Sequence, residues 1–130
     1  MTEQADIRCR AAACLENLGD DKEWSVYLLN DGTRALSRVV LKTFGHEWGN
    51  FGDAVHPSVE VTDVSPGSHV LLWRDNDHEL RMWLTLAVWV DDRETEWLVE
   101  FPMLYRSKDT LPLVESLGKP GWVVRIGDWG

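Results

Sequence analysis

The close spacing of turn signals along the chain is the feature that most constrains the fold. Clusters of Gly, Asn, Asp and Pro, such as ENLGDD, NDGT, SPGS, VDDRET and LGKPG, interrupt the sequence repeatedly. Between them lie runs of about 7 to 11 residues that are rich in Val, Leu, Trp and Thr, which is typical of antiparallel sandwiches and barrels. The sequence therefore predicts an all-β fold.

One segment carries two conflicting patterns. IRCRAAACLEN has apolar residues at helical spacing and an alanine-rich middle, which favours a helix. It also alternates strictly, and a turn follows it, which favours a strand. We predict a strand, so the expected strands are 6–16, 23–30, 36–44, 58–64, 69–74, 80–91 and 95–105.

The turns of the first half of the chain are predicted next. Asn30-Asp31-Gly32 consists of residues that tolerate positive φ, so we expect a tight hairpin turn between 23–30 and 36–44. Residues 45–57 (GHEWGNFGDAVHP) are expected to form a polar loop.

The stretch AACLENLGDDKEWSVYLLNDGTRALSRVVLKTFG resembles a group of short bacterial conserved hypothetical proteins. The shared pattern is a strand ending in Glu-Asn, then Trp-x-Val-Tyr-Leu-x-Asn, an aspartate-rich turn, a valine strand and a glycine. The resemblance extends through VSPGSHVLLW and WLTLAVWV and spans residues 7 to 105. It implies an immunoglobulin-like β-sandwich, and it implies no known activity.

We therefore expect an immunoglobulin-like antiparallel β-sandwich of about seven to eight strands, as sandwiches of this size have. A chain of 130 residues has the length of one domain with a single core. Residues 1–105 are expected to form the sandwich, and residues 106–130 a C-terminal extension packed on one sheet of the same domain. The expected core residues are Val26, Leu28, Val39, Leu41, Val70, Leu72, Leu84, Leu86, Val88, Val99 and Phe101.

The charge balance disfavours nucleic acid as a partner. The formal net charge is −9, whereas phosphate binding needs a concentrated basic surface. The nearest basic groupings, Arg8 with Arg10 and Arg106 with Lys108, are too small to form one. No apolar run is long enough to span a bilayer, and the N-terminus lacks a signal-peptide pattern.

The two cysteines predict a reducing compartment. On one extended strand Cys9 and Cys14 lie about 16 Å apart, beyond the reach of a disulfide. Unpaired thiols suit the cytoplasm, and we expect both to be buried as small apolar residues.

A metal site is an unfavoured alternative in the segment 45–57. His46, Glu47, Asp53 and His56 fall within eleven residues, and imidazoles with carboxylates can bind a divalent metal. The spacing matches no established zinc motif, so we expect no cofactor. No serine lies in a nucleophile-elbow context, and no pair of carboxylates shares a predicted pocket, so we expect no enzymatic activity.

Tryptophan is the informative residue type, with eight in the chain. On strand 80–91 one face is a continuous apolar ridge, whereas the other carries Trp83 and Trp89 where an exposed strand face should be polar. Trp73 of the neighbouring strand is expected to join them.

Three explanations remain open for this tryptophan face. It is covered by the C-terminal extension through Leu111, Leu113, Val114, Leu117, Trp122 and Trp129, or it is buried in a homodimer, or it binds a ligand such as a saccharide. We predict a non-enzymatic cytoplasmic protein-interaction module that meets a basic partner, or itself, through an edge strand or residues 45–57. The alternative is a small-ligand or saccharide-binding sandwich that uses Trp73, Trp83 and Trp89.

Overall fold

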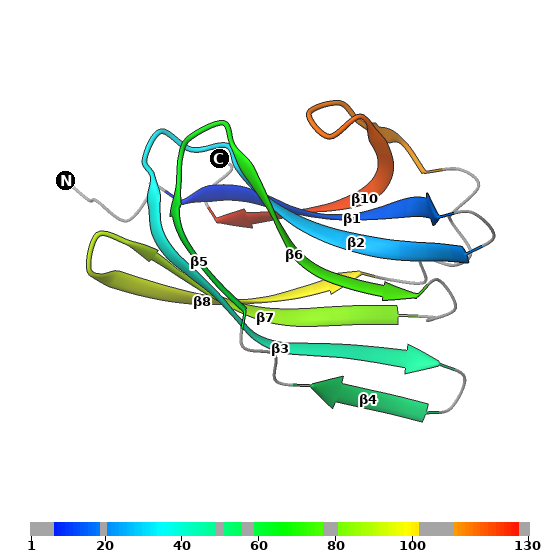
Figure 1. The fold of residues 1–130 in the computed structure, drawn as a ribbon. Coiled ribbons are helices and arrows are strands. Elements are labelled where there is room, and N and C mark those ends of the chain that lie inside the picture. The colour runs from blue at the N-terminus through cyan, green and yellow to red at the C-terminus, as the bar shows by residue number, and fades with distance from the viewer. Residues whose placement is uncertain are drawn as a thin grey trace.

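Two antiparallel sheets packed face to face form the protein (Figure 1). The structure is a computed structural model that describes residues 7–18, 21–48, 51–55, 59–76, 81–101 and 111–127. The first sheet has the order β6 (His69–Asn76), β2 (Asp21–Asn30), β1 (Arg8–Leu18), β10 (Lys119–Gly127) and β9 (Leu113–Val114). The second has the order β4 (Phe51–Val55), β3 (Leu36–Trp48), β7 (Arg81–Val90) and β8 (Arg93–Phe101), and β5 (Val59–Val64) also pairs with β3. The described residues contain no helix, so the all-β prediction is confirmed.

The first predicted strand is confirmed as β1. Its alternation places Cys9, Ala11 and Ala13 in the core between the sheets, whereas Ala12 and Cys14 are buried on the outer face of the first sheet. The strand lies between two partners, β2 and β10. Both sides of its backbone are therefore paired, which outweighs the helix propensity of its alanines.

The core between the sheets contains every residue that was predicted for it. Ten of the eleven are buried, and Val70 is partly buried against them. The largest fully buried side chains are Trp24, Phe44 and Phe101, and Trp24 lies on the face of β2 that alternation assigns to the core.

The predicted hairpin at Asn30-Asp31-Gly32 is wrong. β2 and β3 belong to different sheets, so residues 31–35 cross from one sheet to the other. The side chain of Asn30 organises this crossing: its Oδ1 accepts from the Gly32 N–H (3.0 Å), and its Nδ2 donates to the carbonyls of Arg34 (2.9 Å) and Val64 (3.0 Å). Asn and Gly therefore serve a side-chain-supported turn, and Gly32 is not among the positive-φ residues.

A second crossing lies against the first. Residues 65–68 link β5 of the second sheet to β6 of the first, with Gly67 at a φ of 82°. The Asn30 N–H donates to the Ser68 carbonyl (2.9 Å), and the Gly67 N–H donates to the Asn30 carbonyl (2.7 Å). Asn30 is therefore the point at which these two connections between the sheets are joined.

Two further expectations are corrected by the strands. Residues 45–57 are not simply a loop, because β3 continues to Trp48 and pairs with β4. Residues 113–114 and 119–127 are strands of the first sheet. Because β10 pairs directly with β1, this part of the C-terminal segment is built into the sandwich and does not simply lie upon it.

The described part of the C-terminal segment covers the outer face of the first sheet, whereas one of the three open explanations placed the segment on the tryptophan face of the second. Val114 and Leu117 pack on Ala12, Cys14, Tyr27 and Leu29, on the outer face of the first sheet. Leu111 and Trp122 pack against the central core, and Leu113 remains 62% exposed. We call residues 111–118 the C-terminal lobe. Trp129 lies outside the described residues.

Candidate functional site

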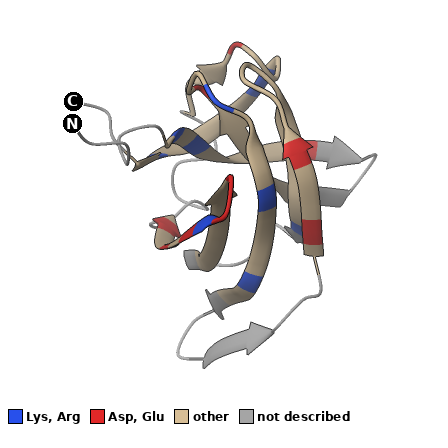
Figure 2. Ribbon diagram, turned by 90° about the vertical axis from the view of Figure 1, so that its left-hand side faces the viewer, with Lys and Arg blue, Asp and Glu red and all other residues tan. Residues whose placement is uncertain are grey.

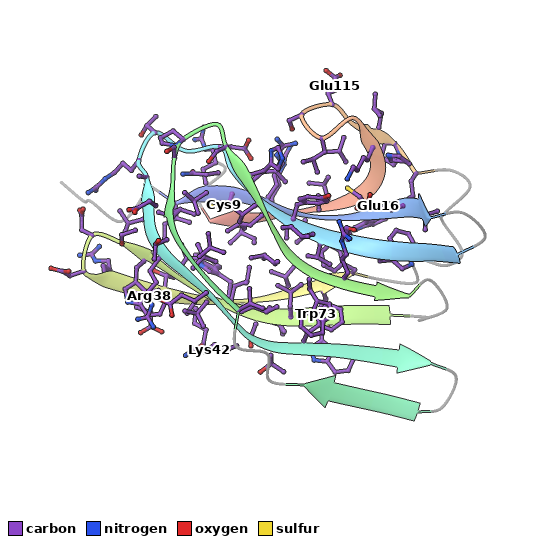
Figure 3. All side chains as sticks on the ribbon, viewed as in Figure 1. Cys9, Glu16, Arg38, Lys42, Trp73 and Glu115 are labelled. Atoms are coloured by element: carbon purple, nitrogen blue, oxygen red, sulfur yellow. The ribbon has the colours of Figure 1, made fainter. Side chains whose placement is uncertain are left out.

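The three tryptophans proposed as a binding cluster are not together. Trp73 lies between the sheets, stacked on Phe44 with ring centroids 5.2 Å apart (Figure 3). Trp83 and Trp89 are half-buried on the outer face of the second sheet, as alternation along β7 predicts. Within the described part of the chain, the buried Nε1 of Trp73 has no hydrogen-bond partner.

Trp83 and Trp89 have different surroundings on that face. Trp83 lies directly over Gly45, its cross-strand partner: a β-carbon at Gly45 would come within 2.1 Å of Cε2 of the indole. The guanidinium of Arg38 lies 4.5 Å from the centre of the Trp89 ring. The same guanidinium forms an ion pair with Glu60 (2.8 Å). At one end of the face the indole of Trp83 covers the backbone of Gly45. At the other end the guanidinium of Arg38 covers the ring of Trp89.

A second cation spans the centre of this face. Lys42 of β3 reaches across β7 to Glu94 (3.5 Å) and Glu96 (2.6 Å) of β8. Ala87 of β7, which has Val40 and Glu96 as its neighbours on the two flanking strands, is fully buried beneath it. The small side chain leaves room for the lysine to cross, and Figure 3 shows Arg38 and Lys42 on this outer side of the sheet.

The outward positions of β8 combine acids with an exposed apolar side chain. Glu94, Glu96, Leu98 and Glu100 alternate along one side of the strand, and we call them the acidic row. Leu98 is 62% exposed, and its three companions are exposed as well. An apolar side chain flanked by carboxylates is a surface suited to a partner that is both apolar and basic.

The residues proposed as a metal alternative lie on the hairpin of β3 and β4. His46 is the cross-strand partner of Asp53, and Glu47 is the partner of Gly52. His56 and the side chains of the other three lie outside what the structure describes. No group of three His, Cys, Asp or Glu side chains that could hold a metal ion occurs among the side chains it does describe.

A polar network that the sequence did not reveal lies on the outer face of the first sheet. Glu16 of β1 accepts hydrogen bonds from the hydroxyls of Ser25 and Tyr27 (the latter 3.2 Å). Lys119 of β10 donates to Glu16 (3.0 Å) and to the Tyr27 oxygen (2.6 Å). We call these four residues the clasp, because they join β1, β2 and the beginning of β10 beside the C-terminal lobe. Figure 3 shows Glu16 near the lobe.

The electrostatics of the clasp keep its two charged groups ionised. The hydrogen bond from Ser25 is the largest effect that lowers the pKa of Glu16, and the contacts from Lys119 and Tyr27 lower it further. The hydrogen bond with Tyr27 is the largest effect that raises the pKa of Lys119. Both pKa values move away from neutrality, so the clasp has the properties of a structural ion pair.

Cys9 and Cys14 form no disulfide and both are buried, as predicted. Burial raises the pKa of Cys9 to about 12 and that of Cys14 to about 11. Both thiols are therefore protonated at neutral pH and poor nucleophiles.

The structure also adds an arginine to the small basic grouping seen in the sequence. Arg125 of β10 is the direct cross-strand partner of Arg10, and Arg8 lies two residues before Arg10 on the same face of β1. In Figure 2 blue segments lie close together on the strands that lead to the two chain ends. Only the pairing of β1 with β10 creates this cluster, and 117 positions of sequence separate Arg8 from Arg125.

Comparison with known proteins adds no assignment. No protein family, curated protein or solved structure matches this chain. Among the described residues, none forms a helix that could cross a membrane.

Proposed function

We propose that this protein is a non-enzymatic cytoplasmic protein-interaction module with an immunoglobulin-like topology. The strand order supports the topology, because β6-β2-β1 facing β4-β3-β7-β8 corresponds to strands E-B-A facing C′-C-F-G of immunoglobulin domains. The β10 and β9 strands then extend the first sheet beyond strand A.

The acidic row on β8 is the observation that carries the interaction proposal. The C-terminal lobe buries apolar residues on the outer face of the first sheet, and on the second sheet Leu98 stays 62% exposed among exposed carboxylates. The partner that fits is a basic segment of another protein with an apolar side chain for Leu98. Like charges would face each other if two copies paired through this row, so self-association by this surface is disfavoured.

A peptide-display selection tests this proposal. Peptides selected on the wild-type protein are expected to carry Lys or Arg next to an apolar residue. The double variant Glu96→Gln/Glu100→Gln should bind them at least about tenfold more weakly, because it removes two exposed charges of the row. Glu115→Gln, which removes an exposed charge on the C-terminal lobe, is the matched control and should bind normally. Peptides without an excess of basic residues, or equal binding by the double variant, would refute the proposal.

Saccharide binding is a second candidate, favoured by the position of Trp83 over Gly45. An indole laid on a sheet surface can offer its other side to a sugar ring, whereas Trp89 already contacts Arg38. A response of tryptophan fluorescence to a panel of neutral saccharides is then expected, and Trp83→Leu should abolish it. Trp73→Phe is the control, since Trp73 packs in the core and its loss should leave the response in place.

A further inference from the structure

The strand that carries the acidic row is also an edge strand. β8 lies at one end of the second sheet (Figure 1), and β7 is the only described strand that pairs with it. The ladder between β7 and β8 covers all nine residues of β8 and has no register shift. Among the described residues, the other side of the β8 backbone therefore has no strand beside it. An unpaired edge of this length is a template for a further strand.

The turn between β7 and β8 determines which backbone groups point to this free edge. Asp91 and Asp92 form a two-residue turn, so Val90 and Arg93 are a pair that exchanges both of its hydrogen bonds. Hydrogen-bonded and non-hydrogen-bonded pairs alternate along an antiparallel ladder. The N–H and C=O groups that point away from β7 consequently belong to the four residues of the acidic row.

The other ends of the two sheets are less suited to accept a strand. β9 has only two residues and β4 has five. The ladder of β6 with β2 contains a register shift, and such irregularities twist an edge away from regular pairing. β8 is the edge that combines length with a regular ladder.

The side chains of the acidic row define the chemistry of a strand that could pair there. Lys42 forms ion pairs with both Glu94 and Glu96. Among the described side chains, Glu100 has no ion pair, so three carboxylates and one ammonium group leave two negative charges in excess. A second copy of β8 would be repelled, whereas a strand with Lys or Arg at alternate positions would be attracted. Leu98, 62% exposed between Glu96 and Glu100, would face an apolar side chain of that strand.

We propose that an extended basic segment of another protein pairs with β8 as an additional antiparallel strand of the second sheet. Its basic residues and one apolar residue lie on the outer face beside the acidic row. Its intervening residues are apolar and lie on the inner side, next to Trp97 and Val99, which pack in or against the core. Main-chain hydrogen bonds supply affinity in this mode of recognition, and the alternate side chains supply specificity. The inference rests on the proposed function, since it uses the same surface, and it adds the conformation of the partner.

A designed peptide, acetyl-Lys-Val-Leu-Val-Lys-Val-Lys-amide, tests this pairing on the full-length protein. In the antiparallel register its leucine lies opposite Leu98, and its three lysines lie opposite the three glutamates of the row. Amide hydrogen exchange, followed by NMR, should show at least about tenfold more protection of the Glu96 and Leu98 N–H groups when the peptide is bound, because these groups gain acceptors.

Two N-methylated forms of the peptide separate backbone pairing from side-chain attraction. In this register the leucine N–H faces β8, whereas the N–H of the valine that follows it faces away. Methylation of the leucine nitrogen should weaken binding at least about tenfold, because it removes a hydrogen bond and places a methyl group between the strands. Methylation of the valine nitrogen is the matched control, with the same charges and side chains, and should change binding less than about threefold.

The outcomes distinguish this inference from the proposed function. Equal binding of the two methylated peptides, without protection at Leu98, would overturn strand addition. If that binding were still weakened by Glu96→Gln/Glu100→Gln, the interaction function would stand and only the added strand would be refuted. Absence of binding by the parent peptide below about 1 mM would also overturn strand addition. The peptide-display selection then decides separately whether the acidic row binds basic segments in another way.

Discussion

At the scale of single residues, Asn30 decides how the chain passes between the sheets. Its side chain is 1% exposed and its amide and carbonyl groups contact three segments: the crossing at 32–34, the end of β5 at Val64, and the turn at 67–68. A buried amide that satisfies several backbone groups at once is costly to remove, because each carbonyl left without a donor keeps its desolvation cost.

Asn30→Ala is therefore expected to lower the free energy of unfolding by about 2–3 kcal/mol. Chemical denaturation measures this loss. Thr33→Ala, at an exposed position in the same connection, is the control and should change stability by less than about 0.5 kcal/mol. A loss below about 1 kcal/mol for Asn30→Ala would show that water replaces the side chain without strain.

Gly45 allows Trp83 to lie against the sheet, which gives a second prediction at this scale. Gly45→Ala should destabilise the fold by about 1–3 kcal/mol, because the added methyl group overlaps the indole. In a Trp83→Leu background the same substitution should cost less than about 1 kcal/mol, since the ring is absent. Equal costs in both backgrounds, measured by denaturation in a double-mutant cycle, would contradict this account.

At the scale of elements, the C-terminal lobe and the clasp act together on the first sheet. The lobe excludes water from Cys14 and Leu29 through Val114 and Leu117, and the clasp joins β10 to β1 and β2 at the edge of the same patch. Apolar burial stabilises the contact, while the clasp fixes where β10 begins. Opening of the lobe should therefore expose the Cys14 thiol.

Lys119→Met should increase the rate at which Cys14 is alkylated by iodoacetamide at least about tenfold, because local opening controls access to buried groups. Cys9 lies in the core between the sheets and serves as an internal control in the same mass spectrum. Equal acceleration at both cysteines would indicate global destabilisation, and no acceleration would show that the lobe is held by its apolar contacts alone.

The clasp also predicts a pH dependence. The folded-state pKa of Glu16 is lowered, so the stabilisation from its charge is present above its usual value of 4.5 and is lost as the pH falls through the lowered value. The stability difference between wild type and Glu16→Gln should therefore shrink as the pH falls below about 4.5. Denaturation curves from pH 3 to 7 measure it, and a constant difference would refute the role of the charge.

At the scale of the whole molecule, the strands nearest the two ends of the chain are neighbours. β1 and β10 pair from Arg8 with Gly127 to Cys14 with Gly121, and Ile126 of β10 is buried in the core. Contacts between residues so distant in sequence are the ones that make a β-fold cooperative and slow to form. The C-terminal strand is consequently expected to be essential to the domain.

Truncation after Gly118 should abolish the cooperative thermal transition seen by circular dichroism. The deletion removes β10, one of the two partners of β1, and exposes the core, so the remaining chain should not fold as an independent sandwich. Leu113→Ala, at a 62% exposed position of the same segment, is the control and should melt like the wild type. A cooperative transition in the truncated chain would show that residues up to 118 fold alone.

Strand positions and the core could be predicted because both depend on local alternation. Residues such as Leu84, Leu86 and Val88 repeat every second position, and that period alone assigns them to the buried face. The hairpin at Asn30 was predicted wrongly, because the same Asn-Asp-Gly chemistry supports both a hairpin and a crossing between sheets. The choice between them depends on Val64 and Ser68, which are distant in sequence.

For the candidate sites too, local alternation could be read from the sequence, whereas contacts between distant segments could not. Alternation correctly placed Trp83 and Trp89 on one outer face. It placed Trp73 wrongly, because a register shift in the pairing of β2 with β6 falls beside this residue. The acidic row could have been found from the alternation of Glu94, Glu96 and Glu100 with apolar residues. The clasp and the arginine cluster could not, since each needs a residue of β10 beside β1.

The sequence by itself determined the all-β class, most strand positions, the composition of the core and the burial of Cys9. These follow from period-two patterning and turn chemistry, which act over a few residues. Only the tertiary structure decided that the C-terminal lobe covers the first sheet, that β10 pairs with β1, and that Arg125 faces Arg10. Those outcomes depend on strand order and register, which are selected by the packing of the whole core and leave no signal in any one segment.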